Sequence, residues 1–311
     1  MPRSAQLSAD LKMTDSEFRL FSELIRSRCG LHYDEDTRFL VEKRIARRIA
    51  DSDAGSFASY LYQLRCGANA EEEFSKLVDL ITTNETYFFR ERSQLTALVQ
   101  EIIPDVLSRT QGARRPVSIW SAGCSSGEEP FSIVMMALEA NLVPGRDFRV
   151  YASDISSAVI SKARRGIYRE TSFRETEQSM RMRYFAQKDG LMRISDEVKR
   201  HVDFVRMNLL DSAKVGLLGS MDVVLCRNVV IYFDADSKKQ VMSTFHDKLR
   251  PGGYLLLGHA ESLINVTSDF ELKHLSRDLV YRRPVPGEEV EDSWHALARD
   301  GIASVDESGG R

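Results

Sequence analysis

The sequence predicts an α/β fold with a doubly wound, mostly parallel sheet, preceded by a small all-α domain. The first observation is a helical pattern without strand alternation from about residue 16 to residue 100. The second is a regular alternation of β-rich runs and helical patterns after residue 116, which is typical of parallel sheets. The third is a glycine-containing turn at residues 121–127, between a strand and a helix, where such folds bind ligands.

The N-terminal region is expected to be a helical bundle. The apolar residues that recur there at helical spacing are Phe18, Phe21, Leu24, Ile25, Phe39, Leu40, Ile45 and Ile49. Further helices are expected over residues 56–66 and 70–80, separated by Gly67. We expect residues 15–92 to form one helical domain that recognises the substrate.

The α/β pattern extends over residues 117–283, after a linker helix and loop at 93–116. Strands are expected near residues 117–121, 148–153, 202–206, 221–226 and 253–258, and helices near 128–141, 156–165, 172–184 and 235–248. A small antiparallel hairpin, with its turn at Asp189 and Gly190, is expected within 184–206. The acidic tail, 284–311, is expected to be disordered.

Composition excludes several classes of protein. The four cysteines are scattered without a C-x-x-C pair, which argues against a zinc site or a disulfide framework, so we expect no metal. Free thiols fit a reducing cytoplasm. No apolar run is long enough to cross a membrane, and the N-terminus lacks the apolar centre of a signal peptide. We therefore expect a cytoplasmic protein that does not insert into membranes.

The turn after the first strand predicts a nucleoside site. Gly123 and Gly127 allow close approach of the backbone to a ligand, and Asp154 ends the second strand, where a ribose diol is bound in such folds. No Gly-Lys-Ser/Thr follows the turn, and the helix begins with Glu128 and Glu129, which would repel a pyrophosphate. S-adenosylmethionine, a cationic nucleoside without phosphate, fits this pattern better than NAD or ATP.

The segment TNETYFFR, at 83–90, combines polar and aromatic residues between the two regions. Asn84, Thr86 and Arg90 offer an amide, a hydroxyl and a cationic fork, which together can hold a carboxylate. The three rings at 87–89 are equally well explained as core residues.

Polar residues also follow the later strands. Asn228 and Tyr232 come after the strand at 221–226, where they either line a pocket or serve as a turn cap and a packing residue. Asn208 follows the strand at 202–206 and is either an adenine contact or a turn residue. His259 and Glu261 follow the strand at 253–258 and are candidates for the mouth of a substrate site.

The helix expected over residues 38–49 is strongly basic. Its cations are Arg38, Lys43, Arg44, Arg47 and Arg48, beside a single acid, Glu42. Alternatively, these cations form an ordinary solvent-exposed helix face without a partner. Such a local field indicates an acidic macromolecular partner, and no nucleic-acid-binding module accompanies it, so nucleic acid is not expected.

Five segments together resemble the CheR family of chemotaxis receptor methyltransferases. They are TNETYFFR (83–90), SAGCSSGEEPFS (121–132), ASDIS (152–156), CRNVVIYFD (226–234) and GGYLLLGHAES (252–262). The resemblance covers roughly residues 15–283. It implies a Rossmann-like class I methyltransferase sheet with an inserted hairpin subdomain. It also implies methyl transfer from S-adenosylmethionine to glutamate side chains on the cytoplasmic helical bundle of chemoreceptors, giving γ-methyl esters and S-adenosylhomocysteine.

The resemblance also implies roles for individual residues. With Gly123 from the turn, the expected cofactor-binding residues are Asn84, Thr86, Arg90, Gly123, Glu129, Asp154, Asn208, Leu209, Cys226, Arg227 and Asn228. Arg90 and Tyr232 are expected nearest the transferred methyl group, as the catalytic residues. Because a glutamate carboxylate is ionised near neutral pH, alignment rather than a strong base is expected to drive the reaction.

The resemblance also implies a partner for the basic helix. This partner is the receptor, because the methylated sites on receptors are flanked by acids. The short hairpin turn, AQKDG, contains one glycine, whereas some family members use a longer loop to hold a receptor tail peptide. We therefore expect a monomer that binds the receptor bundle directly, without tail-peptide tethering.

Two other functions remain as alternatives from the sequence. One is a non-catalytic signalling module that binds S-adenosylmethionine or S-adenosylhomocysteine. The other is a methyltransferase that acts on a small molecule or on nucleic acid, although the Asn/Asp-Pro-Pro-Tyr-like motif of many nucleic-acid enzymes is not found.

Overall fold

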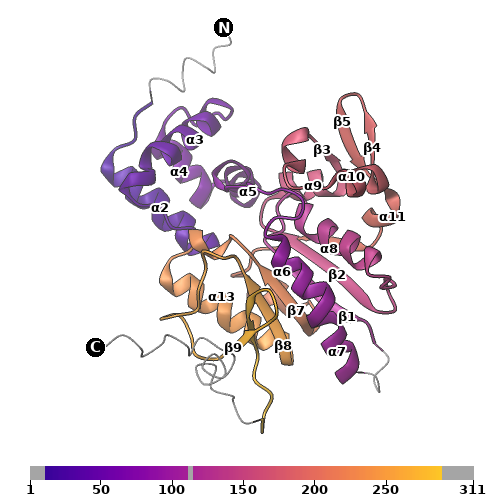
Figure 1. Cartoon of the computed structure of the whole chain (residues 1–311). Coiled ribbons are helices and arrows are strands. Elements are labelled where there is room, and N and C mark those ends of the chain that lie inside the picture. The colour runs from indigo at the N-terminus through magenta and orange to yellow at the C-terminus, as the bar shows by residue number, and fades with distance from the viewer. Residues whose placement is uncertain (1–10, 111–114, 289–311) are drawn as a thin grey trace, which may run out of the picture.

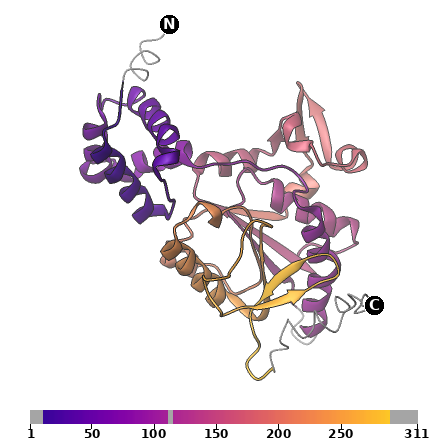
Figure 2. The ribbon, with the colours of Figure 1, turned by 60° about the vertical axis from the view of Figure 1, so that its left-hand side comes forward.

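A computed structural model describes residues 11–110 and 115–288 of the chain. A helical domain lies beside a larger α/β domain, and a small antiparallel sheet projects from the α/β domain (Figure 1). In a second view, the helical domain and the small sheet lie on opposite sides of the main sheet (Figure 2). Most of the tail expected to be disordered, residues 289–311, lies outside the described residues, as does part of the expected loop, 111–114.

From residue 11 onward, where the structure describes the chain, four helices form the N-terminal domain. They are α2 (Asp15–Cys29), α3 (Arg38–Ala50), α4 (Phe57–Cys66) and α5 (Ala70–Ile81), with a 3-10 turn, η1 (Glu35–Thr37), before α3. Helix α2 begins at a capping box, in which Thr14 and Glu17 satisfy each other's backbone N–H groups. It ends at Gly30, whose φ of 75° is the left-handed conformation that favours glycine. The predicted helical bundle is therefore present.

Helix α3 buries two of its four expected apolar residues and exposes the other two. Its buried residues are Val41, Ile45, Ala46 and Ile49, whereas Phe39 is 75% exposed and Leu40 is 41% exposed. The reason is helical phase, because residues 41, 45 and 49 share one face and Leu40 points to the other side. The helix thus presents apolar side chains as well as cations to solvent.

The main sheet has seven strands in the order β6-β2-β1-β7-β8-β10-β9. Their bounds are β1 (Val117–Ala122), β2 (Phe148–Asp154), β6 (Val202–Arg206), β7 (Met221–Cys226), β8 (Leu249–Leu257), β9 (Glu271–His274) and β10 (Leu279–Arg282). The first five in this order are parallel, whereas β10 pairs antiparallel with both β8 and β9. The doubly wound sheet is confirmed, although the β9–β10 hairpin was not predicted. Strand order reverses between β1 and β7, where such sheets bind ligands.

Helices cover both faces of this sheet. They are α6 (Arg92–Ala97), the π-helical η2 (Leu98–Ile102), α7 (Ile103–Arg109), α8 (Glu128–Glu139), α9 (Ser157–Arg165), α12 (Ser212–Gly216) and α13 (Ala235–Lys248). On one face, α13 packs through Phe245 against Trp120, in a core that continues into the helical domain. On the other face, Leu98 and Ile102 are buried with α8. The expected linker helix is therefore part of the α/β packing.

The small sheet pairs β3 (Ile167–Tyr168), β5 (Leu191–Ile194) and β4 (Phe185–Lys188) in that order. Asp189 and Gly190 have φ of 52° and 72°, which suits the predicted two-residue hairpin turn. The hairpin is shorter than expected, because residues 202–206 pair with β2 in the main sheet.

The remaining short elements also refine the prediction. The helix expected over 172–184 is divided into a 3-10 turn, η4 (Glu170–Phe173), and α10 (Gln178–Tyr184). A one-turn helix, α11 (Asp196–Lys199), connects the hairpin to β6, and a 3-10 turn, η5 (Val230–Tyr232), follows β7.

Polar contacts hold the helical domain against the carboxyl edge of the sheet. Asp79 of α5 accepts hydrogen bonds at 2.7 Å from the hydroxyls of Ser156 and Ser157 at the start of α9. At the end of the neighbouring strand β6, the Nδ2 of Asn208 donates to the carbonyl of Arg28 at 2.6 Å. On the other half of the sheet, the carbonyl of Tyr232, after β7, accepts the N–H of His32 at 2.8 Å. Both halves of the sheet therefore contact the helical domain.

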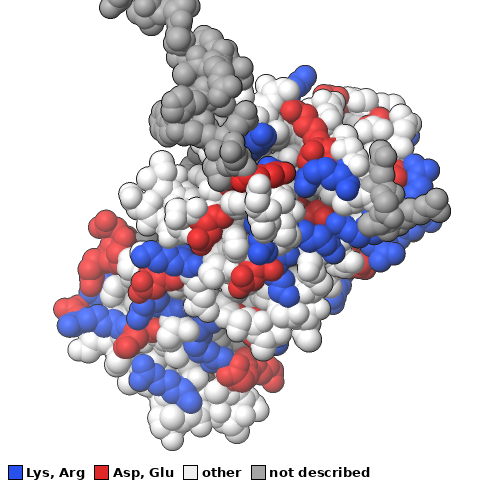
Figure 3. All heavy atoms as spheres, turned by 90° about the horizontal axis from the view of Figure 1, so that it is seen from below, with Lys and Arg blue, Asp and Glu red and all other residues white. Residues whose placement is uncertain are grey.

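The charges of the chain are mixed on the face seen from below. Acidic and basic side chains lie side by side there, without a single-sign field (Figure 3). Among the described residues, no helix has the length and apolar character needed to cross a membrane.

Phe88→Ala is expected to lower the free energy of unfolding by about 3–5 kcal/mol, because Phe88 is fully buried. Its ring lies about 5 Å from those of Tyr168, Phe173 and Phe185. Urea unfolding measures the change. The control, Tyr62→Ala at an exposed position, should stay within about 0.5 kcal/mol; a similar loss in both variants would contradict the assignment of Phe88 to the core.

Candidate functional site

A cleft lies at the carboxyl ends of β1 and β7, where the strand order reverses. The predicted site residues that line it are Asn84, Thr86, Arg90, Gly123, Glu129, Asp154, Asn208, Leu209, Arg227, Asn228 and Tyr232. The segment that joins the two domains, residues 82–87, forms part of its wall, with Cys29 and Leu31 of the helical domain. The structure therefore brings these predicted residues together in one cleft.

The turn after β1 brings backbone to the cleft surface. Gly123 has a φ of 82°, and a Cβ atom there would lie 2.4 Å from a methyl group of Val229. The N–H groups of Gly123 and Cys124 both donate to the carbonyl of Ser153, at 2.7 and 2.9 Å. This position therefore requires glycine, and the turn is fixed against the end of β2.

Asp154 ends β2 and is 8% exposed. Its carboxylate accepts the backbone N–H groups of Ser125 and Ser156, each at 2.9 Å. Burial raises the pKa of Asp154, and these N–H groups act in the opposite direction. Each carboxylate oxygen retains acceptor capacity, so Asp154 can bind a pair of hydroxyls in the cleft.

The two acids at the start of α8 have different positions. Glu128 is 1% exposed and accepts hydrogen bonds from the hydroxyls of Ser126 and Ser172, and burial raises its pKa. Glu129 lines the cleft and accepts the hydroxyl of Ser121 at 2.7 Å. Of these two acids, Glu129 is the one that faces the cleft, because Glu128 belongs to the interior.

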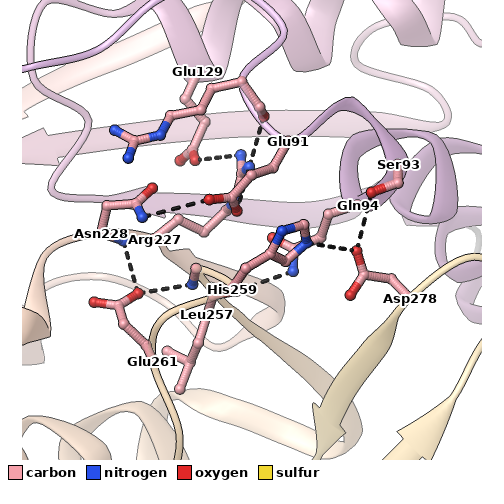
Figure 4. Close-up of polar contacts among 12 residues, drawn as sticks. Glu91, Ser93, Gln94, Glu129, Arg227, Asn228, Leu257, His259, Glu261 and Asp278 are labelled. Carbon is pink, nitrogen blue, oxygen red and sulfur yellow. Dashed lines mark hydrogen bonds and ion pairs between the residues drawn. The ribbon is translucent and has the colours of Figure 1, made fainter.

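Arg227 joins three segments of the site (Figure 4). Its side chain is 2% exposed, and its guanidinium lies 3.0 Å from the carboxylates of both Glu129 and Glu91. It also donates to the carbonyl of Arg90 at 2.6 Å. The charge of Arg227 is thus balanced within the protein, and Glu91 is a site residue that the sequence reasoning missed.

Cys226 does not line the cleft, in contrast to the expectation. Its side chain is fully buried in the core that contains Trp120 and Phe245. Burial raises the pKa of its thiol well above the usual value. The physical reason is strand alternation, because successive side chains of β7 point to opposite faces of the sheet.

Arg90 is presented by an unusual backbone. The residues on either side, Phe89 and Glu91, have φ of 62° and 51°, a conformation that is uncommon outside glycine. The N–H of Phe89 donates to the hydroxyl of Ser132 at 2.9 Å, which fixes this conformation. Arg90 itself donates to the carbonyl of Glu85 and lines the cleft. Strained backbone of this kind is concentrated at functional sites.

Of the three aromatic residues at 87–89, two belong to the core and one lies at the cleft. Phe88 and Phe89 are fully buried core residues, whereas Tyr87 lines the cleft. Arg174 of the small-sheet region lies 3.7 Å above the ring of Tyr87.

Asn208 lines the cleft, but its amide has structural partners. The Nδ2 contact with Arg28 is joined by a hydrogen bond from the N–H of Leu210 to Oδ1 at 3.1 Å. Asn208 therefore serves as a turn residue, which is one of the two roles that the sequence left open.

His259 and Glu261 lie outside the cleft lining. The His259 ring contacts Asp278, and the Glu261 carboxylate accepts backbone N–H groups, including that of Asn228 at 2.7 Å (Figure 4). The position of Glu261 at a strand end marked it as a candidate site residue. That position did not indicate that its carboxylate would bind backbone N–H groups.

The basic helix α3 uses most of its cations internally. Arg48 forms a two-pronged ion pair with Glu73 at 2.6 and 2.8 Å, and Arg38 pairs with Asp15 at 2.7 Å. Arg44 donates to a backbone carbonyl at the end of α5. Lys43 and Arg47 are exposed. The outward field of the helix is therefore weaker than five cations would give.

Within the described residues, no group of three or more His, Cys, Asp or Glu side chains is placed to hold a metal ion.

Comparison with known families gives two matches that together span most of the chain. The family described as "CheR methyltransferase, SAM binding domain" matches residues 84–278, and "CheR methyltransferase, all-alpha domain" matches residues 16–82.

Individual relatives agree with these matches. Chemotaxis protein methyltransferase 2 of Vibrio cholerae is 37% identical over 286 residues, which cover 91% of this chain and 98% of that protein. The chemotaxis protein methyltransferase of Escherichia coli K12 is 34% identical over 273 residues, covering 86% and 92%. Among solved structures, an O-methyltransferase family protein from Burkholderia thailandensis matches with a TM-score of 0.38 and 12% identity, over 92% of this chain and 89% of that chain.

Arg227→Met is expected to lower the free energy of unfolding by about 3–5 kcal/mol, because it leaves Glu91 and Glu129 without their cation in a mostly buried position. Urea unfolding monitored by circular dichroism measures the change. Arg165→Met, at an exposed position on α9, is the control and should change stability by less than about 0.5 kcal/mol. A loss below about 1 kcal/mol for Arg227→Met would contradict the role of this ion cluster.

Proposed function

The chain belongs to the CheR family of S-adenosylmethionine-dependent chemotaxis protein methyltransferases, and from that premise we propose how its cleft and its helical domain methylate receptor glutamates. The cleft binds the methyl donor, Arg90 and Tyr232 act at the transferred methyl group, and the exposed face of α3 contacts the receptor. The observation that carries the proposal is that Glu129, Asp154, Arg90 and Tyr232 all line one cleft at the switch point of the sheet.

The residues of the cleft fit S-adenosylmethionine. When bound, it supplies a methyl group on a positively charged sulfur. Asp154 accepts hydrogen bonds from the ribose hydroxyls, as the acid at the end of the second strand does in related nucleotide sites. Glu129 adds negative charge for the cationic amino-acid part of the donor. Gly123 leaves room for close backbone approach, and Arg227 does not oppose the cation because two acids balance its charge.

Arg90 and Tyr232 orient the acceptor glutamate. A carboxylate oxygen forms the new bond to the methyl carbon while the carbon–sulfur bond breaks and its electron pair remains on sulfur. No proton moves, so no general base is needed. Arg90 holds the acceptor carboxylate by charged hydrogen bonds. The Tyr232 hydroxyl donates a further hydrogen bond to this carboxylate, close to the transferred methyl group. Alignment of this kind supplies up to roughly 7–11 kcal/mol in well-oriented reactions.

The receptor surface is an exposed stripe of α3. Phe39, Lys43 and Arg47 are four residues apart and share one side of the helix, with Leu40 beside them. Two exposed cations next to apolar side chains suit a helical bundle whose methylation sites are flanked by acids. The two-residue turn at Asp189 and Gly190 is short, which favours direct contact with the bundle over tethering by a tail peptide. We further propose that the protein acts as a cytoplasmic monomer.

Arg90→Ala is expected to lower kcat by roughly tenfold to a hundredfold or more, because a charged hydrogen bond contributes about 1.5–3 kcal/mol. Transfer of labelled methyl groups to a receptor cytoplasmic fragment measures kcat, and base lability of the label identifies an ester. The matched control is Arg92→Ala, two residues along, whose guanidinium pairs with Glu177 outside the cleft. Near-normal turnover by Arg90→Ala would count against the assigned role.

Lys43→Glu combined with Arg47→Glu is expected to raise KM for the receptor fragment about tenfold and to weaken its salt dependence, because two steering charges change sign. The affinity for S-adenosylhomocysteine, measured by calorimetry, should not change. The control pair, Arg165→Glu with Arg169→Glu, carries the same charge change at exposed positions of the α/β domain. An equal effect of both pairs would contradict a specific role for α3.

A further inference from the structure

The carboxylate of Glu261 collects backbone N–H groups from two separate segments. Its Oε2 atom accepts the N–H groups of Asn228 and Gly258, both at 2.7 Å. Its Oε1 atom accepts those of Val229 at 2.9 Å and Ile231 at 3.2 Å. Figure 4 shows the carboxylate beside Asn228 and below the Arg227 cluster. One side chain therefore binds the end of β8 to the loop that follows β7.

The loop at residues 228–231 directs three backbone N–H groups at one carboxylate. Asn228 has a φ of 59°, in the left-handed region, and the N–H groups of this loop converge on one point. Converging N–H groups form a concavity that binds anions, and leaving such donors without a partner is costly. Glu261 supplies that anion from within the protein. Burial raises its pKa, whereas the same N–H groups favour its charged form.

The end of β8 is shaped for this contact. A Cβ atom at Gly258 would lie 2.7 Å from Nδ2 of Asn228 and 2.9 Å from Oε2 of Glu261. Only glycine allows the two segments to approach so closely. The loop position is thus set jointly by Gly258 and by the Glu261 carboxylate.

The same loop forms part of the cleft. The side chain of Val229 packs against the backbone of Gly123, and Tyr232 follows at the cleft surface. On its other side, the carbonyl of Tyr232 accepts the N–H of His32 from the helical domain at 2.8 Å. A shift of the loop would therefore move Tyr232 relative to the methyl-donor site.

We propose that Glu261 is a positioning residue for methyl transfer, whose carboxylate holds residues 228–231 so that Tyr232 keeps its place in the cleft. The inference rests on the proposed role of Tyr232. Glu261 lies outside the cleft lining and acts through the backbone of the loop rather than by contact with either substrate.

Glu261→Gln tests this role, because it keeps the side-chain shape but turns an amide donor toward backbone N–H groups. The expected result is a loss of kcat of roughly tenfold or more, equivalent to one charged hydrogen bond, with KM for the receptor fragment unchanged. Hydrogen–deuterium exchange of the full chain, with and without S-adenosylhomocysteine, should show faster exchange at residues 228–231 only. The control, Glu197→Gln at an exposed position, should alter neither measurement.

A double variant separates this inference from the role of Tyr232. If Glu261 acts through Tyr232, Glu261→Gln adds little further loss of kcat in a Tyr232→Phe background, whereas multiplied losses would overturn that route. Normal kcat in Tyr232→Phe alone would contradict the proposed role of Tyr232. In that case, hydrogen–deuterium exchange of Glu261→Gln still tests whether Glu261 holds residues 228–231. Unchanged exchange at 228–231 in Glu261→Gln, or equally faster exchange along the whole chain, would overturn the positioning role.

Discussion

The buried guanidinium of Arg227 holds the site together. It comes from the end of β7 and binds Glu129 of α8, Glu91 and the carbonyl of Arg90. Removing charges from water is costly unless they are paired with good geometry, so these groups fix one another. Three segments that are far apart in the sequence are thereby joined where the strand order of the sheet reverses. Arg90 lines the cleft beside this cluster, and its guanidinium donates to the carbonyl of Glu85.

Around this cluster, the backbone departs from its local preferences. Phe89, Glu91 and Asn228 all have positive φ without being glycine, at a cost of order 1–3 kcal/mol for each residue. Specific partners stabilise these conformations, such as the Ser132 hydroxyl for Phe89 and the Glu261 carboxylate for the loop after β7. These three positions lie where Arg90 and Tyr232 enter the cleft. Such positions fix side-chain direction more firmly than a relaxed loop does.

The helical domain contributes to the cleft as well as to the proposed receptor contact. Its polar contacts through Asp79 and Arg28 reach the half of the sheet edge that contains β2 and β6. On the other half, Leu31 forms a backbone bridge with Phe233, after β7. The exposed stripe of α3 is therefore carried by a domain that is fixed to the loop after β7. Docking of a receptor helix on that stripe would set the distance of its glutamates from the cleft.

The sequence by itself determined the doubly wound sheet, the predicted strands and the segments that form the cleft, because hydrophobic periodicity, glycine turns and strand ends are local signals. The tertiary structure alone decided which charges face outward. Arg38 and Arg48 pair with acids 23 and 25 residues away, Glu128 is buried, and Cys226 points into the core. Glu261 has main-chain partners about 30 residues away. Such pairings depend on the approach of distant segments, which periodicity within one segment does not encode.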